Sequence, residues 1–265
     1  MSKKVQKKNI HIKKWDELAD DEKARFTMNG SVQKSDYCCE VTGRFVGAIH
    51  EYGSALKNNY WHKNYINELV EKAKKRKTNY YHETDIFLYN CLTFVNYQNF
   101  YSLKDKSIAV LGSVEPWYEA ICLAYGAAPT TIEYNELYSN HDKINLMTVD
   151  EYNKNPIKFD VAISISSFEH DGLGRYGDPI DPDGDLKAMQ NVRENILKDN
   201  GFLFLSVPIG GDKIVWNAHR IYGPVRWPKL IEGFDIVYSS GFSDAFLSRD
   251  MGLSTYQPVV VLKKS

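Results

Sequence analysis

The chain has 265 residues, of which 43% are apolar and 25% charged, and its net charge is −1. This composition is ordinary for a soluble globular protein. The chain contains no internal repeat, no low-complexity segment and no window that approaches the ~18 apolar residues of a membrane span. Its length suits one large α/β domain, or one such domain with an appendage.

The charge is divided unevenly between two halves. Residues 1–106 carry a net charge of +6 and residues 107–265 a net charge of −7. Lysines cluster near the N-terminus and in residues 72–77 (KAKKRK), where no aromatic residues interleave as base stacking would require. We interpret these runs as a solvated tail and a helix end. The acidic second half disfavours a nucleic-acid partner.

The four cysteines, Cys38, Cys39, Cys91 and Cys122, lack metal-ligand spacing, and the adjacent pair is a poor disulfide candidate. The charged N-terminus lacks the apolar core of a signal peptide. We therefore expect a reducing, cytoplasmic location.

Residues 1–106 are predicted to form an N-terminal helical or lid region. Residues 15–28 are amphipathic and acidic at their start, and residues 55–77 place apolar side chains on one helix face. Residues 85–101 are dense in aromatic and apolar side chains, so we expect them to pack against the second half. Residues 29–53 are rich in turn residues and are not assigned to an element.

Residues 107–135 predict a strand, a tight turn, a helix and a second strand. The apolar run 108–111 stops at Gly112, Pro116 suits the first turn of a helix, and a short strand 130–132 leads to Glu133. Gly112 and Glu133 are 21 residues apart, as in nucleotide-binding βαβ units whose acid binds the ribose hydroxyls. The segment therefore predicts an adenosine-containing cofactor.

The rest of the chain continues to alternate strand and helix, which is typical of a doubly wound α/β sheet. A weak strand is predicted at 144–149 and a strong buried strand at 159–165, followed by the polar run from Ser166 to His170. Asp185 is predicted to cap a helix that continues to Leu197, and Gly201 to end that helix in the left-handed conformation. Further strands are predicted at 201–207, 234–238 and 259–263.

This order of signals resembles that of the class I S-adenosylmethionine-dependent methyltransferases over residues 107–265. Three segments carry the likeness: VLGS with its distant glutamate, FDVAISISSFEH, and ENILKDNGFLFLSVP. The segments VLGSVEPWYEA, GAAPTTIEYN, FEHDGLGRYGDPIDPDGD and AHRIYGPVRWP further resemble a methyltransferase-like domain family of unknown function. The resemblance implies a Rossmann-like sheet of about seven strands with the last strand antiparallel, and S-adenosyl-L-methionine as cofactor.

One feature departs from the superfamily pattern. Its glycine-rich turn here keeps only Gly112, while Val114 and Pro116 stand where glycine lets the backbone approach the cofactor. A nicotinamide fingerprint is weakened at least as much, because it needs three glycines around a pyrophosphate.

The cofactor-binding residues that we expect lie where the strands end. The helix after Gly112 and Ser113 presents free N–H groups to a carboxylate, and Glu133 accepts the ribose hydroxyls. Glu115 either reaches the cationic end of the cofactor or caps the helix. Met147 or Thr148 stands where an adenine contact is usual in the superfamily, and Ser166 begins the run beside the methyl group.

Candidate catalytic residues follow the strand 159–165. A hydroxyl acceptor benefits from a base with a pKa near neutrality, so His170 is the first candidate and His219 the second. Glu169 would orient a histidine or hold the acceptor hydroxyl. For His170 the alternative is a structural histidine bonded to the backbone.

The polar loop 171–185, in which five of 15 residues are aspartate, is predicted to bind the acceptor. Hydrogen bonds to a sugar-like substrate suit it best; the alternatives are a divalent metal and a solvated loop, and its spacing is not that of a calcium loop. Arg220, in the loop after a later strand, either binds an anion or pairs with a nearby aspartate. The substrate-binding candidates are Arg175, Tyr176, Asp178 and Arg220.

The sequence thus predicts a methyltransferase for a small polar acceptor, acting by O-methylation of a sugar or sugar conjugate. Two alternatives stay open. One is a non-catalytic methyltransferase-like binding module, which the depleted glycine turn favours. The other is a Rossmann-type oxidoreductase that uses a nicotinamide cofactor.

Overall fold

The computed structural model describes residues 13–35, 59–98, 101–176, 178–250, 252 and 256–265. The predictions that concern Cys38, Cys39, the first lysines and residues 36–53 lie outside these ranges. Among the described residues, none of the helices is both long and apolar enough to cross a membrane.

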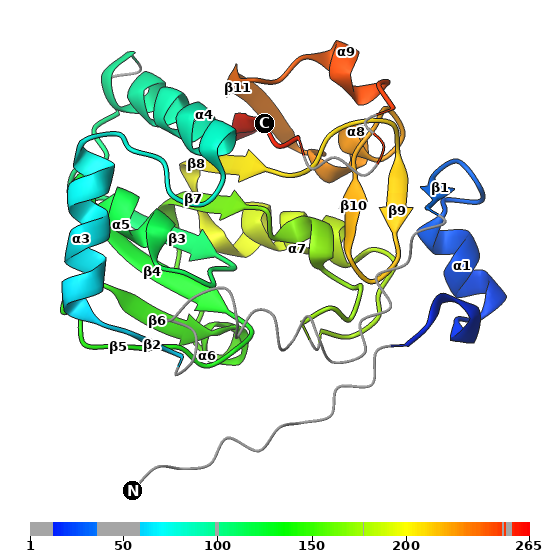
Figure 1. Cartoon of the computed structure of the whole chain (residues 1–265), viewed down its shortest axis with the longest axis horizontal. Helices are drawn as coiled ribbons and strands as arrows, with labels where there is room; N and C mark the ends of the chain where they lie inside the picture. Colours follow the sequence, from blue (N-terminus) through cyan, green and yellow to red (C-terminus); the bar gives the residue numbers. More distant parts are fainter. Residues whose placement is uncertain (1–12, 36–58, 99–100, 177, 251, 253–255) are drawn as a thin grey trace, which may run out of the picture.

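A seven-stranded sheet forms the centre of the molecule, with strand order β11-β12-β8-β7-β3-β4-β6 (Figure 1). Strands β6, β4, β3, β7 and β8 are mutually parallel, and β12 runs antiparallel to both of its neighbours. The fold prediction is therefore confirmed. The strands are β3 (Ser107–Leu111), β4 (Ala128–Glu133), β6 (Asn145–Thr148), β7 (Phe159–Ile165), β8 (Leu197–Ser206), β11 (Phe234–Ser240) and β12 (Val259–Lys264).

Helices cover both faces of the sheet because its buried strands are apolar on both sides. Along β3, Ile108 and Val110 pack with the first helical layer, whereas Ala109 and Leu111 pack with the second. The first layer consists of α3 (Lys63–Lys74), α4 (His82–Thr93) and α5 (Trp117–Ala124). The second consists of α6 (Val149–Lys154), α7 (Gly184–Asn191), α8 (Trp227–Leu230) and α9 (Asp244–Leu247).

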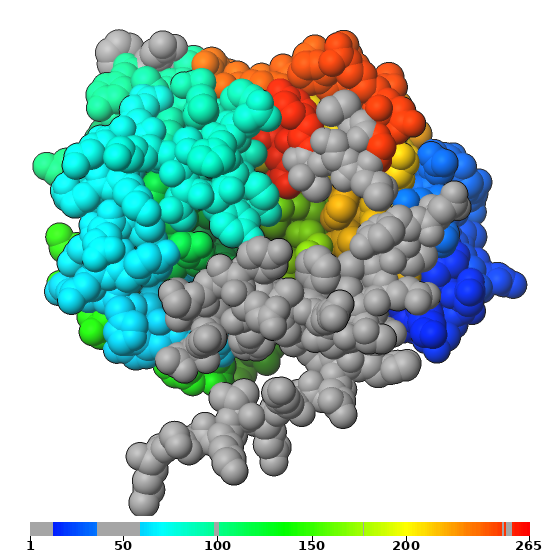
Figure 2. All heavy atoms as spheres, viewed as in Figure 1, coloured from blue at the N-terminus to red at the C-terminus, as the bar shows by residue number. Residues whose placement is uncertain are grey.

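The helical region before β3 thus belongs to the same core as the sheet. Leu88 and Leu92 of α4 are buried with sheet residues, which confirms the expected packing of the aromatic-rich segment. After α4 the chain forms a single π-helical turn, Phe94–Gln98. In the space-filling view α3 and α4 form one flank of the molecule (Figure 2, cyan).

An N-terminal segment, residues 13–35, packs on the opposite flank against a hairpin far along the chain (Figures 1 and 2, blue). Its strand β1 pairs with β9, and β9 pairs with β10. Trp15 and Phe26 pack on Trp216 with ring centroids 5.2 and 5.0 Å away. These elements are a 3-10 turn (Trp15–Glu17), α1 (Asp20–Phe26), β1 (Gln33–Lys34), β9 (Lys213–Val215) and β10 (His219–Ile221). Two further strands, β2 (Tyr60–Trp61) and β5 (Tyr138–Ser139), pair with each other in a separate small sheet.

Two local predictions were wrong. Asp185 does not cap the helix, because α7 begins at Gly184 with Asp183 at the N-cap, and Asp185 is buried against arginines instead. Gly201 does not end the helix, which finishes in a π-helical turn, Val192–Ile196, before β8 starts at Leu197. A Cβ at Gly201 would come within 3.0 Å of the Asp160 carbonyl oxygen, so close strand contact explains this glycine.

Candidate active site

The turn after β3 brings together two loops at the carboxyl edge of the sheet. Gly112 has a φ of +71°, and a Cβ there would lie 2.1 Å from Ser167 Oγ in the loop after β7. Both the backbone conformation and the contact between loops therefore require glycine. A single glycine therefore suffices for this approach of the two loops.

Glu133 ends β4 with its carboxylate held against the same turn. Its Oε2 accepts a hydrogen bond from the Ser113 backbone N–H at 3.1 Å, and Oε1 accepts one from the Asn135 backbone N–H at 3.3 Å. Burial raises the pKa of Glu133, while these backbone donors act in the opposite direction. The structure therefore joins Gly112, Ser113 and Glu133, as the sequence predicted for a ribose site.

The carboxylate of Glu115 contacts the N-terminal region. It accepts hydrogen bonds from the Tyr65 hydroxyl on α3 and from Asn79 Nδ2, the latter at 3.3 Å. Helix capping was one of the two roles considered for Glu115, but the N-cap of α5 is Pro116. Instead, Glu115 joins the turn after β3 to the helical layer.

Thr148 lies beside Glu133 in the sheet and caps α6. Its Oγ1 accepts a hydrogen bond from the Glu151 backbone N–H at 3.2 Å, and Glu151 Oε2 accepts from the Thr148 N–H at 2.7 Å. Met147 and Thr148 also line a hollow beside β6, together with Glu136 and Leu137. The position is compatible with an adenine contact and also has a clear structural role.

Glu119 is a buried acid that sequence reasoning missed. It lies on α5 with no exposed surface, and its Oε1 accepts a hydrogen bond from Thr131 Oγ1 at 2.7 Å. Its Oε2 has no hydrogen-bond partner among the described residues. Burial raises the pKa of Glu119 to about 7. The acidic residue in an otherwise apolar helix, WYEAICLA, was the available signal.

Ser166 is the centre of a polar cluster after β7. Its φ of +53° is unusual for a residue other than glycine and indicates backbone strain. Its Oγ donates to Glu169 Oε1 at 2.6 Å and accepts from Gln257 Nε2 at 3.1 Å and from the Tyr81 hydroxyl at 3.3 Å. Three distant parts of the chain therefore meet at one serine.

Glu169 and His170 lie side by side in a short 3-10 turn, Phe168–His170. Glu169 is fully buried, which raises its pKa to about 7, and its Oε1 lies 3.6 Å from His170 Nε2. His170 Nδ1 lies 2.5 Å from the Ala218 carbonyl oxygen. The same Nδ1 lies 3.2 Å from Arg175 Nη1, which only donates, so the contacts of this ring do not select one tautomer.

Two other candidate residues, His219 and Tyr176, have side-chain rings close to that of His170. His219 is 6.5 Å away between ring centroids, and Tyr176 is 5.4 Å away in an edge-on arrangement. Burial and the Arg175 guanidinium lower the pKa of His170 well below its ordinary value and that of His219 to about 4. Both imidazoles are therefore neutral at pH 7, and both are weaker bases than the near-neutral histidine that the sequence predicted.

Arg175 and Asp178 organise the loop around this cluster. Arg175 Nη1 donates to the Ala218 carbonyl oxygen at 2.8 Å, and its guanidinium lies over the Tyr176 ring. Asp178 accepts hydrogen bonds from the backbone N–H groups of Gly174 and Tyr176 at 3.0 and 3.1 Å. The carboxylate of Asp178 thereby fixes the local turn.

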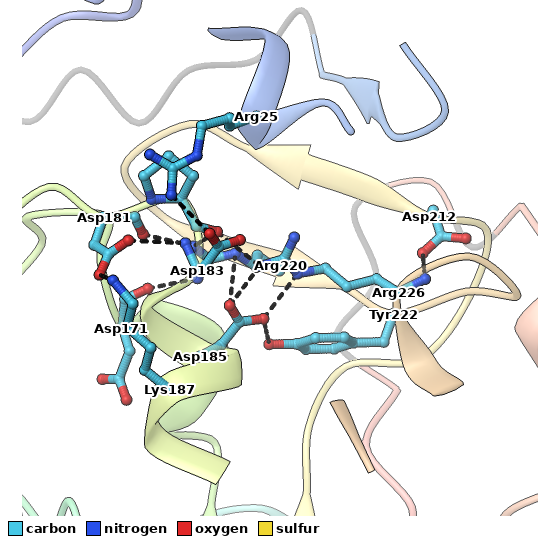
Figure 3. A network of polar contacts seen from close by, with 11 residues as sticks. Arg25, Asp171, Asp181, Asp183, Asp185, Lys187, Asp212, Arg220, Tyr222 and Arg226 are labelled. Atoms are coloured by element: carbon cyan, nitrogen blue, oxygen red, sulfur yellow. Dashed lines mark hydrogen bonds and ion pairs between the residues drawn. The ribbon is translucent and has the colours of Figure 1, made fainter. Parts of the chain in front are cut away.

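Arg220 is buried behind the loop, with 2% of its surface exposed. It donates to the Asp171 carbonyl oxygen at 2.6 Å, and its Nε lies 3.7 Å from Asp185 Oδ1 (Figure 3). The structure supports the alternative in which Arg220 pairs with an aspartate. We therefore assign Arg220 to the loop's support rather than to contact with a substrate.

The loop aspartates contact protein groups instead of a common centre (Figure 3). Asp185 binds Arg226 at 2.5 and 2.8 Å, Asp183 binds Arg25 of α1 at 2.7 Å, and Asp181 binds Lys187 at 2.5 Å. Within the parts of the chain that the structure describes, no group of three or more His, Cys, Asp or Glu residues could hold a metal ion.

Two contributors to the cluster had no distinguishing signal in the sequence. Tyr81 begins the aromatic-rich helical region, and Gln257 stands just before β12. Their contacts to Ser166 span 85 and 91 residues, so only the fold brings them together.

Comparison with known proteins identifies one family and a common fold. The family model described as Caenorhabditis protein of unknown function, DUF268, matches residues 105–256, which is more than half of the chain. A comparison with the curated proteins finds no sequence match.

One solved methyltransferase structure shares the fold at low sequence identity. The 1,6-didemethyltoxoflavin-N1-methyltransferase of Burkholderia thailandensis, solved with 1,6-didemethyltoxoflavin and S-adenosylhomocysteine, has a TM-score of 0.50 and 12% identity; 87% of this chain and 93% of that chain are covered. A putative SAM-dependent methyltransferase from Streptococcus mutans has a TM-score of 0.44 and 13% identity over 69% and 49% of the two chains. The fold is that of the class I methyltransferases.

Proposed function

The chain belongs to the family described as Caenorhabditis protein of unknown function, DUF268, and within that family we propose that it is an S-adenosyl-L-methionine-dependent methyltransferase. The acceptor is a small polar molecule, and the specific reaction is O-methylation of a sugar or sugar conjugate. One observation carries the proposal: Glu133 is fixed to the Gly112 turn directly beside the loop that bears Ser166, Glu169 and His170.

The residues at this edge of the sheet fit the cofactor. Glu133 would accept the ribose hydroxyls, Met147 and Thr148 would lie along the adenine, and Gly112 and Ser113 would lie at the amino-acid end. Because the Glu115 carboxylate is drawn toward Tyr65 and Asn79, it does not compete for that space. The bound cofactor supplies an electrophilic methyl group on a sulfonium.

Glu169, His170 and His219 would handle the acceptor proton. His170 is neutral at pH 7, so one of its ring nitrogens is unprotonated and can accept the proton. His219 Nε2 has no hydrogen-bond partner among the described residues, which makes it the second candidate. Burial of Glu169 and His170 limits the access of water and favours alignment of the acceptor.

The loop 171–185 would form the acceptor wall, with Arg175, Tyr176 and Asp178 as its functional positions. In the described part of residues 1–106, Tyr65 and Tyr81 would form one side of the acceptor pocket, since they reach the turn after β3 and the Ser166 cluster.

Calorimetric titration with S-adenosylhomocysteine, with NAD titrated in parallel, tests the proposal. We expect micromolar binding of S-adenosylhomocysteine and none of NAD. Preference for NAD would identify an oxidoreductase, and binding of neither would favour a non-catalytic module.

Glu133→Gln is expected to weaken S-adenosylhomocysteine binding by ~10-fold or more. The variant loses the charge that strengthens hydrogen bonds to both ribose hydroxyls, and each such bond is worth ~1.5–3 kcal/mol. Glu232→Gln is the matched control, because Glu232 is exposed in the segment between α8 and β11, away from the proposed cofactor residues. Equal affinities of the wild type and both variants would remove the ribose assignment.

A further inference from the structure

We infer that the first turn of α4 belongs to the candidate site, and that Thr84 is a positioning residue that acts on Ser166 through Gln257. The inference rests on the proposed function, because Ser166 bonds the carboxyl of Glu169, which is proposed to handle the acceptor proton. It is carried by hydrogen bonds that join α4, the segment before β12 and the loop after β7.

Thr84 directs its hydroxyl away from its own helix. Thr93, at the other end of α4, donates to the carbonyl oxygen of Tyr89 four residues earlier, at 2.7 Å, as helical threonines often do. Thr84 Oγ1 instead donates to the Gln257 carbonyl oxygen at 2.8 Å, across 173 residues of chain. Thr84 and Gln257 are 5% and 3% exposed, so water competes little for this bond. The bond therefore ties the backbone of Gln257 to α4.

Gln257 transmits this constraint to Ser166. Its Nε2 donates to Ser166 Oγ at 3.1 Å, and Ser166 Oγ donates to Glu169 Oε1 at 2.6 Å. Ser166 has a φ of +53°, and such a strained conformation persists only where the surrounding contacts hold it. A continuous chain of contacts thus leads from the Thr84 hydroxyl to the Glu169 carboxyl.

The same turn of α4 holds a second partner of Ser166. Asp85 has no exposed surface; its Oδ2 accepts a hydrogen bond from the Asn79 backbone N–H at 2.7 Å, and its own N–H donates to the Tyr81 carbonyl oxygen at 2.7 Å. These bonds fold residues 79–81 onto the helix, and the Tyr81 hydroxyl reaches Ser166 Oγ at 3.3 Å. Two adjacent buried polar residues of α4 therefore hold the two side chains that donate to Ser166 in the described part of the chain.

These supports lie outside the segment that the family model matches. The match covers residues 105–256, so it includes Ser166 and Glu169, whereas Tyr81 and Thr84 precede it and Gln257 follows it. The hydroxyl at the centre of the candidate site is therefore held by parts of this chain that flank the matched segment.

The test is a pH titration of the Glu169 carboxyl, followed by carbon-13 NMR on the full-length protein without ligand, with Glu169→Gln to assign the signal. The pKa of Glu169 is about 7 and the Ser166 hydroxyl lowers it, so a weaker bond raises it. Thr84→Val removes the hydroxyl at nearly constant size, and we expect the titration midpoint to rise by ~0.5 pH unit or more. Thr84→Ser keeps the hydroxyl and should restore the wild-type midpoint.

Thr93→Val is the matched control, because it removes a hydroxyl from the same helix that bonds only within that part of the chain, and it should titrate like the wild type. Gln257→Leu removes the amide and should raise the midpoint by itself, including in the event that Thr84→Val does not fold. Adding Thr84→Val to Gln257→Leu should raise it no further, because Thr84 acts through Gln257.

An unchanged midpoint in Thr84→Val or Gln257→Leu would overturn the inference. So would an equal rise in Thr84→Ser or Thr93→Val, or additive rises in the double variant. Arg175 and Arg220, which also lower the pKa of Glu169, are present in every variant, as is His170. The titration needs no cofactor, so it is independent of the proposed function, which fails if the wild type does not bind S-adenosylhomocysteine.

Discussion

Replacing Asp185 with alanine is expected to lower the free energy of unfolding by ~3–5 kcal/mol. Asp185 is fully buried and binds Arg226, which is itself only 2% exposed, as well as the Tyr222 hydroxyl at 2.9 Å. Alanine leaves the arginine charge buried without its partner, and that residual charge accounts for most of the loss. Urea denaturation at neutral pH measures the effect.

Asp183→Ala is the matched control in the same loop. Asp183 binds Arg25 at 2.7 Å, but the two side chains are 39% and 54% exposed, so solvent screening limits the pair to ~0–1 kcal/mol. Similar losses in the two variants would contradict the assignment of Asp185 as the loop's buried anchor. If Asp185→Ala does not fold, Asp185→Asn, which keeps the size and one acceptor oxygen, should give an intermediate loss.

Glu119→Gln is expected to stabilise the protein in a pH-dependent way. In the unfolded chain the carboxyl has its ordinary pKa of 4.5, whereas burial raises the folded pKa to about 7. Between these values the folded state holds more protons, so the wild type loses stability as pH rises through this window. The loss totals ~3 kcal/mol, because each unit of pKa corresponds to about 1.4 kcal/mol.

Glutamine does not titrate, so the stability difference between variant and wild type should grow by ~3 kcal/mol from about pH 5 to about pH 8. Urea denaturation across this range measures it. Glu169 is present in both proteins, so its titration cancels. Glu71→Gln is a control of opposite sign, since the Lys74 ammonium lowers the pKa of that exposed acid. A constant difference between Glu119→Gln and the wild type would show that Glu119 does not keep its proton in the fold.

Asp185→Ala and Glu119→Gln remove two different sets of buried contacts near the candidate site. Asp185 and the arginines hold the loop 171–185 beside His170, whereas Glu119 and Thr131 lie between α5 and β4, close to the Gly112 turn. Measuring both the free energy of unfolding and the affinity for S-adenosylhomocysteine in each variant will show how much each set of contacts contributes to binding.

The sequence by itself determined the sheet and the positions of Gly112, Glu133 and Ser166. The strand 159–165 matches β7 in full, and the glycine-to-acid spacing located the turn and the acid that the structure joins. These features depend on local apolar runs and on turn conformation, which a short stretch of sequence encodes.

Only the tertiary structure decided which polar groups are occupied and which remain available. Asp185, at the end of the polar loop, and Arg220, in a later polar segment, look like surface residues in the sequence, yet both are buried. Gln257 and Tyr81 gave no local signal, yet both bond Ser166. Hydrogen bonds between residues far apart in the chain depend on the packing of whole elements, and no periodicity in the sequence records them. The physical reason is that burial and partner geometry, rather than residue type, decide whether a charge supports the fold or faces a ligand.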